Sequence, residues 1–172
     1  SQINWKASAR VGNLMVNQKD STTNVDLKLL FDLEDSLILK YPDLIEETLR
    51  IVSSLAARFV SAKMPILISG NIFDPITLEP FYMYLPAGGG KMMELNQKLA
   101  RIDTSQLAFT GATLLEQELK QSSRNYTYVF ISKNHPTDIL EKLQLLSSFG
   151  HQILWIAPVT NTSDLPRFKL PN

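Results

Sequence analysis

The chain has 172 residues, of which 44% are hydrophobic and 20% charged, as is typical of one soluble globular domain. Its 17 Lys and Arg residues balance its 17 Asp and Glu residues. This argues against a nucleic-acid binder or a membrane-surface binder, because both need a surplus of cations. Cysteine is absent, which excludes disulfides, zinc–thiolate sites and cysteine nucleophiles, and no apolar run is long enough to span a membrane.

The first predicted strand, Val25–Leu33, is a mostly apolar run that ends in acidic residues. A helix is predicted over Pro42–Ala62, because a proline opens it and apolar residues recur three and four positions apart. A second apolar strand is predicted over Met64–Ser69, ended by Gly70 and Asn71, and a third, at a sheet edge, over Phe81–Leu85.

The second half of the chain continues the alternation of helices and strands. Helices are predicted over about Lys91–Ile102, Gly111–Ser122 and Pro136–Phe149, and strands over Tyr126–Ser132 and Gln152–Ala157. Such alternation predicts a three-layer α/β/α (Rossmann-like) fold whose mostly parallel central sheet is covered on both faces. We expect a single domain over residues 1–172, with an N-terminal segment 1–24 and a C-terminal tail 158–172.

Polar residues follow the first strand directly, and they include Asp32, Glu34, Asp35 and Ser36. In open α/β sheets, ligands bind beyond the carboxyl ends of the strands, so these residues form the first candidate site. A hard cation such as Mg²⁺ prefers oxygen ligands of this kind. The alternative interpretation, which we favour, is a group of solvated acids that leads into the following helix.

Two further patterns have weaker functional interpretations. The run Gly88-Gly89-Gly90-Lys91 before a helix suggests phosphate binding, but the residue after the lysine is not Ser or Thr, so we interpret it as a flexible loop. His135 and His151 are interpreted as a surface residue and a strand-edge residue, and no catalytic triad can be argued.

The N-terminal motif Trp5-Lys6-Ala7-Ser8-Ala9-Arg10, together with Leu99–Ile102, resembles the signature of the domain-of-unknown-function 58 family. The resemblance implies a von Willebrand factor A-like fold for nearly the whole chain. It also implies transmembrane helices upstream of residue 1, with this piece as the soluble C-terminal region, which we place on the cytoplasmic side. Members often accompany MoxR-type AAA ATPases, and no enzymatic activity is established for the family.

The resemblance also implies a position for a metal site. Von Willebrand factor A domains often hold a divalent cation through Asp-x-Ser-x-Ser, and here Asp32, Glu34 and Ser36 take those places, as ligands for Mg²⁺ or Mn²⁺. Either Thr110 or Thr113, together with Asp103, is a stand-in for the remaining Thr and Asp ligands. Where the family pattern can place an acid, this chain has Lys133, whose ammonium could replace the cation altogether.

The sequence therefore predicts a non-enzymatic protein-interaction or adaptor module that works with a MoxR-type AAA ATPase and binds no nucleic acid. Trp5, Lys6, Arg10 and Asp35 are the candidate partner contacts, but for the N-terminal motif we favour the alternative, in which Trp5 is an anchor that pins the N-terminal segment to the domain. The alternative is a divalent-cation-dependent ligand-binding domain that uses Asp32, Glu34 and Ser36. A hydrolase or nucleotide-binding enzyme ranks third, because it rests on fold analogy and the glycine run alone.

Overall fold

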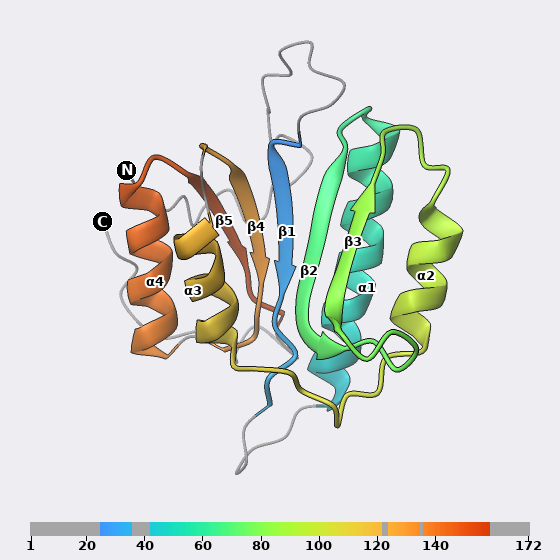
Figure 1. Cartoon of the computed structure of the whole chain (residues 1–172), viewed down its shortest axis with the longest axis horizontal. Helices are drawn as coiled ribbons and strands as arrows, with labels where there is room; N and C mark the ends of the chain where they lie inside the picture. The colour runs from blue at the N-terminus through green and yellow to red at the C-terminus, as the bar shows by residue number, and fades with distance from the viewer. Residues whose placement is uncertain (1–24, 36–41, 122–123, 135, 159–172) are drawn as a thin grey trace.

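A computed structural model of the chain describes residues 25–35, 42–121, 124–134 and 136–158. Strands and helices alternate along these residues in the predicted order (Figure 1). The strands are β1 (Leu27–Phe31), β2 (Ile66–Phe73), β3 (Pro80–Leu85), β4 (Thr127–Ile131) and β5 (Gln152–Ile156). The helices are α1 (Pro42–Ser61), α2 (Met92–Ala100), α3 (Gly111–Gln121) and α4 (Thr137–Ser148).

The five strands form one sheet in the order β3-β2-β1-β4-β5. The central strand β1 pairs in parallel with β2 and with β4, so that Leu27 faces Ile66 on one side and Thr127 on the other. β5 also pairs in parallel, whereas β3 is antiparallel to β2 and lies at the edge. The predicted α/β architecture, the mostly parallel sheet and the edge position of β3 are confirmed.

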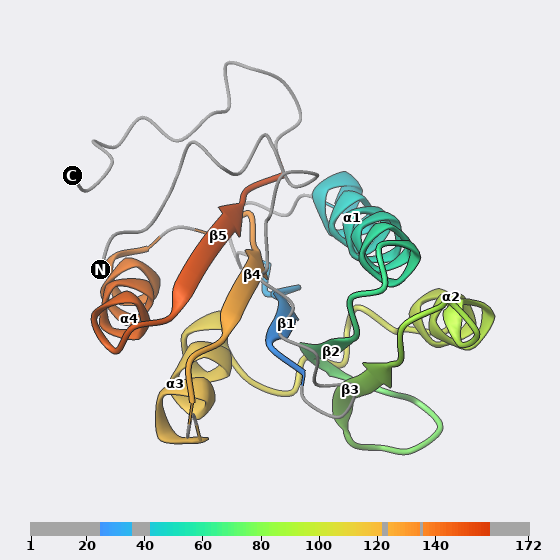
Figure 2. The ribbon, with the colours of Figure 1, turned by 90° about the horizontal axis from the view of Figure 1, so that it is seen from above.

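Helices lie on both faces of the sheet, and each face has its own apolar core (Figure 2). The core under α1 and α2 is built on β1, β2 and β3 and includes Phe31, Ile68 and Phe81. The core under α3 and α4 is built chiefly on β4 and β5 and includes Phe130 and Trp155. Alternate side chains of a strand point to opposite faces, which is why β1 can supply both cores.

Strand β2 is longer than predicted, because it continues through Gly70 and Asn71 to Phe73. The prediction that these two residues end the strand is therefore wrong. A Cβ atom on Gly70 would lie 2.2 Å from the ring of Phe31, so the glycine makes room for a neighbouring aromatic ring rather than breaking the strand.

One part of the sheet is less covered than we predicted. On the face of α3 and α4, these helices lie over β1, β4 and β5, and no described helix lies over β2 and β3 (Figures 1 and 2). The side chains of Tyr82 and Tyr84 on β3 are accordingly exposed. None of the described helices has both the length and the apolar character needed to cross a membrane.

Candidate functional site

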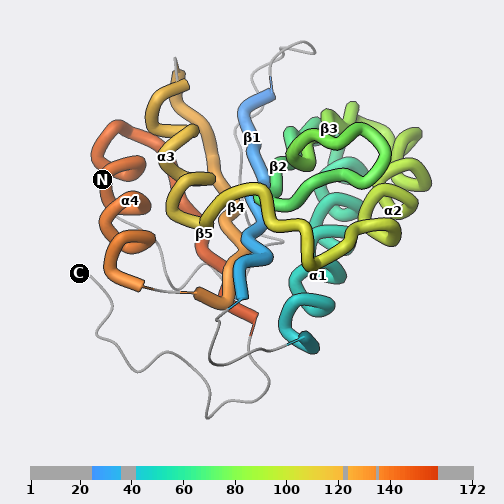
Figure 3. The backbone as a smooth tube through the Cα atoms, turned by 60° about the horizontal axis from the view of Figure 1, so that its bottom comes forward, coloured from blue at the N-terminus to red at the C-terminus, as the bar shows by residue number. Residues whose placement is uncertain are grey.

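The carboxylate of Asp32 is buried just beyond the end of β1. Its backbone N–H donates to the carbonyl of Ile131 (2.9 Å), so the chain stays paired with β4 for one residue beyond the strand. The position is the predicted one, at the carboxyl edge of the parallel strands. Figure 3 brings this edge forward and shows the segment between α2 and α3 crossing it.

Four hydrogen-bond donors surround this carboxylate. Oδ1 accepts from the Asn71 amide (2.7 Å) and from the backbone N–H of Glu34 (2.9 Å). Oδ2 accepts from the Ser132 hydroxyl (2.7 Å) and from the Asn134 amide (3.1 Å). A carboxylate has about four acceptor sites, so neutral donors from three strand ends occupy the acceptor capacity of Asp32.

The two amide groups are fixed in orientation by their other partners. Asn71 accepts the backbone N–H of Leu33 through its oxygen (2.9 Å), so its NH₂ group faces Asp32. The NH₂ group of Asn134 also donates to the carbonyl of Glu34 (2.7 Å). Neither amide can turn an oxygen toward a cation beside Asp32 without breaking a second hydrogen bond.

Helix α3 begins against the same carboxylates. Glu34 Oε2 accepts the backbone N–H of Gly111 (2.9 Å), where a negative charge is favoured by the helix dipole. A Cβ atom at position 111 would lie 2.4 Å from Asp32 Oδ2, so only glycine fits without displacement. Thr110 caps this helix, because its hydroxyl accepts the N–H of Thr113 (3.1 Å).

Lys133 follows β4 and forms an ion pair with Asp35. Both side chains are largely buried, at 6% and 23% exposure. The prediction that this ammonium lies at the same edge as the acids is confirmed. The ammonium of Lys133 therefore lies beside Asp35. It follows β4, at the position where the family pattern described above can place an acid.

The structure thus brings Asp32, Glu34 and Asp35 together. The interpretation of these acids as solvated is wrong for Asp32, which is buried because two neighbouring strands supply its donors. Asp103 lies apart from them and bonds Ser105 in its own loop (2.6 Å). Outside the described residues lie the other predicted site residues, Trp5, Lys6, Arg10 and Ser36, and also His135.

Metal-binding groups of at least three His, Cys, Asp or Glu residues are absent from the described part of the chain. Of the other two predicted ligands, Glu34 accepts the N–H of Gly111, and Ser36 lies outside the described residues. A cation at Asp32 would have to displace at least one of the four donors. The predicted Mg²⁺ or Mn²⁺ site stays a prediction.

The glycine run lies at the other end of the sheet, between β3 and α2. Gly88 and Gly89 have φ angles of +99° and +78°, values that favour glycine, and the N–H of Gly88 donates to the carbonyl of Val60 (3.1 Å). The run therefore forms part of the loop between β3 and α2, and its interpretation as a flexible loop stays a prediction.

A second polar cluster lies near the amino ends of β1 and β4. Lys28 Nζ contacts Glu118 Oε1 of α3 (2.7 Å), and the hydroxyl of Tyr128 donates to the same oxygen (3.0 Å). The ammonium of Lys28 also lies 4.3 Å from the ring centre of Tyr126. Burial, together with the Glu118 charge, raises the pKa of Tyr128, so the phenol stays a hydrogen-bond donor.

His151 borders this second cluster and immediately precedes β5, in keeping with its prediction as a strand-edge residue. Its Nδ1 accepts the backbone N–H of Tyr126 (3.0 Å), which requires that nitrogen to be unprotonated. Burial lowers the pKa of His151, and the charge of Lys28 lowers it further, while Glu118 acts in the opposite direction.

No protein-family model and no curated protein sequence matches this chain.

Sequence reasoning missed the three donors Asn71, Ser132 and Asn134 as site residues. They are short polar residues within, one position after and three positions after apolar strands, and that placement is the signal that could have found them. The strand order was also needed, because it alone puts β2 and β4 on either side of Asp32.

Proposed function

We propose that this domain is a non-enzymatic protein-interaction module of the von Willebrand factor A-like type. In this proposal it is the soluble C-terminal part of a membrane-anchored protein that serves a MoxR-type AAA ATPase as an adaptor or assembly factor, on the cytoplasmic side. The sheet order, with an antiparallel edge strand and an acid directly after the central strand, supports the family resemblance given by the Trp5–Arg10 motif.

The observation that carries the proposal is the hydrogen-bonded state of Asp32. A general acid or base must exchange a proton with a substrate, and a metal ligand must offer a lone pair. The lone pairs of Asp32 are instead directed at four protein donors from three chain segments. Such an arrangement fixes the loops of this edge relative to one another, which a recognition surface requires.

The test is capture of the MoxR-type AAA ATPase of the same organism by this protein, measured by biolayer interferometry. Asp35→Lys is expected to weaken binding about tenfold if Asp35 contacts the partner. The matched control is the swap Asp35→Lys with Lys133→Glu, which restores an ion pair of reversed polarity. Recovery by the swap would mean that Asp35 only positions the loop, and failure of the unsubstituted protein to bind the ATPase would refute the proposal.

The second candidate function is a cation-dependent ligand-binding domain that uses Asp32, Glu34 and Ser36. It is favoured by one observation, the closeness of the Asp32 and Glu34 carboxylates, which both lie against Gly111. Thermal unfolding of chelator-treated protein with millimolar Mg²⁺ or Mn²⁺ tests it, because a cation that binds only the folded state raises the melting temperature. A rise that Asp32→Ala abolishes would establish this function.

A further inference from the structure

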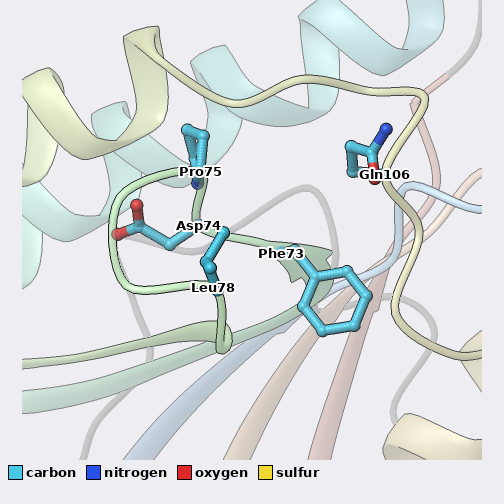
Figure 4. A pocket seen from close by; sticks show the side chains of 5 residues that line it. All are labelled: Phe73, Asp74, Pro75, Leu78 and Gln106. Atoms are coloured by element: carbon cyan, nitrogen blue, oxygen red, sulfur yellow. The ribbon is translucent and has the colours of Figure 1, made fainter.

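An apolar pocket of about 310 Å³ lies where β2 ends and the chain turns toward β3. Phe73, Asp74, Pro75 and Leu78 of the turn line it, and Gln106 lines it from the segment between α2 and α3 (Figure 4). The carboxylate of Asp74 points away from Gln106 in this view. The surface that lines the pocket is mainly apolar. Its size is at the lower end of the range for ligand sites.

The wall of this pocket is held in place by an ionic cluster. Asp74 accepts two hydrogen bonds from the guanidinium of Arg101 (3.2 and 2.8 Å) and lies 3.7 Å from the ammonium of Lys98. The hydrogen bonds from Arg101 lower the pKa of Asp74 to about 2, against the opposing effect of burial, so the cluster stays ionised at neutral pH. The pocket therefore has a preformed shape.

The tip of the turn keeps an apolar residue in an unfavourable conformation. Leu78 has a φ of +61° and is 74% exposed, and its N–H donates to the carbonyl of Asp74 (2.8 Å). The left-handed region disfavours a branched side chain, and an exposed leucine gains little burial in return. Ile76, next to it, is 69% exposed. Strained, exposed apolar residues of this kind cluster at binding sites.

Two exposed acids are close in sequence to residues that line the pocket. Glu79 follows Leu78, and Asp103 lies three positions before Gln106, which lines the pocket from the other side. Hydrogen bonds from Ser105 lower the pKa of Asp103, which therefore stays negative at neutral pH. Within the described part of the chain, neither Glu79 nor Asp103 forms an ion pair.

We propose that this pocket is the docking site for a segment of a partner protein that inserts a large aliphatic or aromatic side chain and places Lys or Arg beside it. The apolar wall accepts the side chain, and Glu79 and Asp103 attract the cation. A second copy of this chain fits poorly, because a two-fold interface through the pocket would bring the same acids together. The inference rests on the proposed function and names the kind of partner segment that it needs.

The binding surface can extend beyond the pocket. A second pocket, also of about 310 Å³, lies between α1 and α2 and is lined by Ile102 and Thr104. Residues 102–106 therefore contribute to the lining of both pockets, and Glu46 and Arg50, which form an ion pair (3.8 Å), also line the second one. A segment that follows these residues from the first pocket would reach that ion pair in the second.

To test the proposal, a library of displayed random peptides is selected for binding to the full chain. The dissociation constants of the enriched peptides are then measured by fluorescence anisotropy. Selected peptides should share a large apolar residue with Lys or Arg nearby. Leu78→Gly and Glu79→Lys should each weaken binding about tenfold, whereas Leu145→Ser, at an exposed position on α4, should leave it unchanged. Leu78→Gly suits the turn, so a melting temperature no lower than that of the unsubstituted protein will show that the fold persists.

Absence of enrichment, peptides without cations, or equal binding by the pocket variants would each overturn the inference. Measuring ATPase capture with the same variants separates it from the proposed function. If the ATPase still binds to Leu78→Gly and Glu79→Lys with full affinity, the pocket is not the docking site but the adaptor function stands. If the unsubstituted protein binds the peptides and not the ATPase, the pocket inference stands and the assigned partner is wrong.

Discussion

Two of the buried acids, Asp32 and Glu118, are stabilised in different ways. Asp32, at the carboxyl edge of the sheet, is surrounded by four neutral hydrogen-bond donors. Glu118, near the opposite edge, is paired with the ammonium of Lys28 and accepts one phenol hydrogen bond. The comparison teaches that one acid depends on the geometry of several chain segments, whereas the other depends mainly on a single opposite charge.

The largest effect should come from removing that single charge. Lys28→Met leaves Glu118 buried without its cation, which should lower the free energy of unfolding by about 3–5 kcal/mol. Urea denaturation measures the loss. The double variant Lys28→Met with Glu118→Gln should recover much of it, because the glutamine oxygen can still accept the Tyr128 hydroxyl. Equal stability of the single and double variants would contradict the comparison.

The next effect concerns the neutral donors. Asp32→Asn keeps the shape of the side chain but turns an NH₂ group toward two of the donors, which should cost about 2–3 kcal/mol in urea denaturation. Glu79→Gln, at an exposed acid, is the control and should change stability little. If Asp32→Asn were as stable as the control, the hydrogen-bond assignment around Asp32 would be wrong.

A smaller effect is expected from the packing of α3 against Asp32. Gly111→Ala places a methyl group where Asp32 Oδ2 lies, and the resulting displacement should cost roughly 1–2 kcal/mol of unfolding free energy. Gly90→Ala is the matched control, because a Cβ atom there meets no other atom within 4 Å. If the melting temperature changes by the same amount in both variants, Asp32 and α3 are not in close contact.

The smallest effect is the pH dependence that His151 contributes near the Lys28–Glu118 pair. Because the folded-state pKa of His151 is lowered, the unfolded chain binds a proton more readily than the folded protein once the pH falls below about 6.5, the ordinary pKa of histidine. Stability from this group should therefore be complete above that value and decrease as the pH falls below it. His151→Asn should flatten this slope in denaturation experiments between pH 7 and 5, and an unchanged slope would assign it to other groups.

The fold could be predicted from the sequence because its signals are local. Continuous apolar runs marked the parallel strands, and a proline with a three-and-four apolar spacing marked α1. The end of β2 could not be predicted, since Gly70 looks like a strand breaker until Phe31 is seen to fill the space beside it. Propensity describes a residue in isolation, and here a neighbour on another strand decided the outcome.

The location of the candidate site could be predicted from the sequence, but the partners of its acidic side chains could not. The acids after β1 indicated the correct edge of the sheet. Whether Asp32 faces water, a cation or protein donors depends on Asn71 and Ser132, which are distant in sequence. The pocket beside Leu78 could not be predicted from the sequence. Leu78 has a positive φ angle, and a leucine gives no indication of such a backbone conformation.

The separation of these partners along the chain has a consequence for synthesis on the ribosome. Asp32 bonds Asn71, 39 positions later, but Ser132 and Asn134 are 100 and 102 positions away. Strand β1 likewise lacks hydrogen-bond partners on one of its two edges until β4 has been synthesised and pairs with it. A nascent chain that ends before β4 can assemble β1, β2 and β3, yet it carries an open edge in the middle of the future sheet and an acid without half of its donors. Chaperone binding during translation should therefore peak over this interval and decline once β4 has emerged.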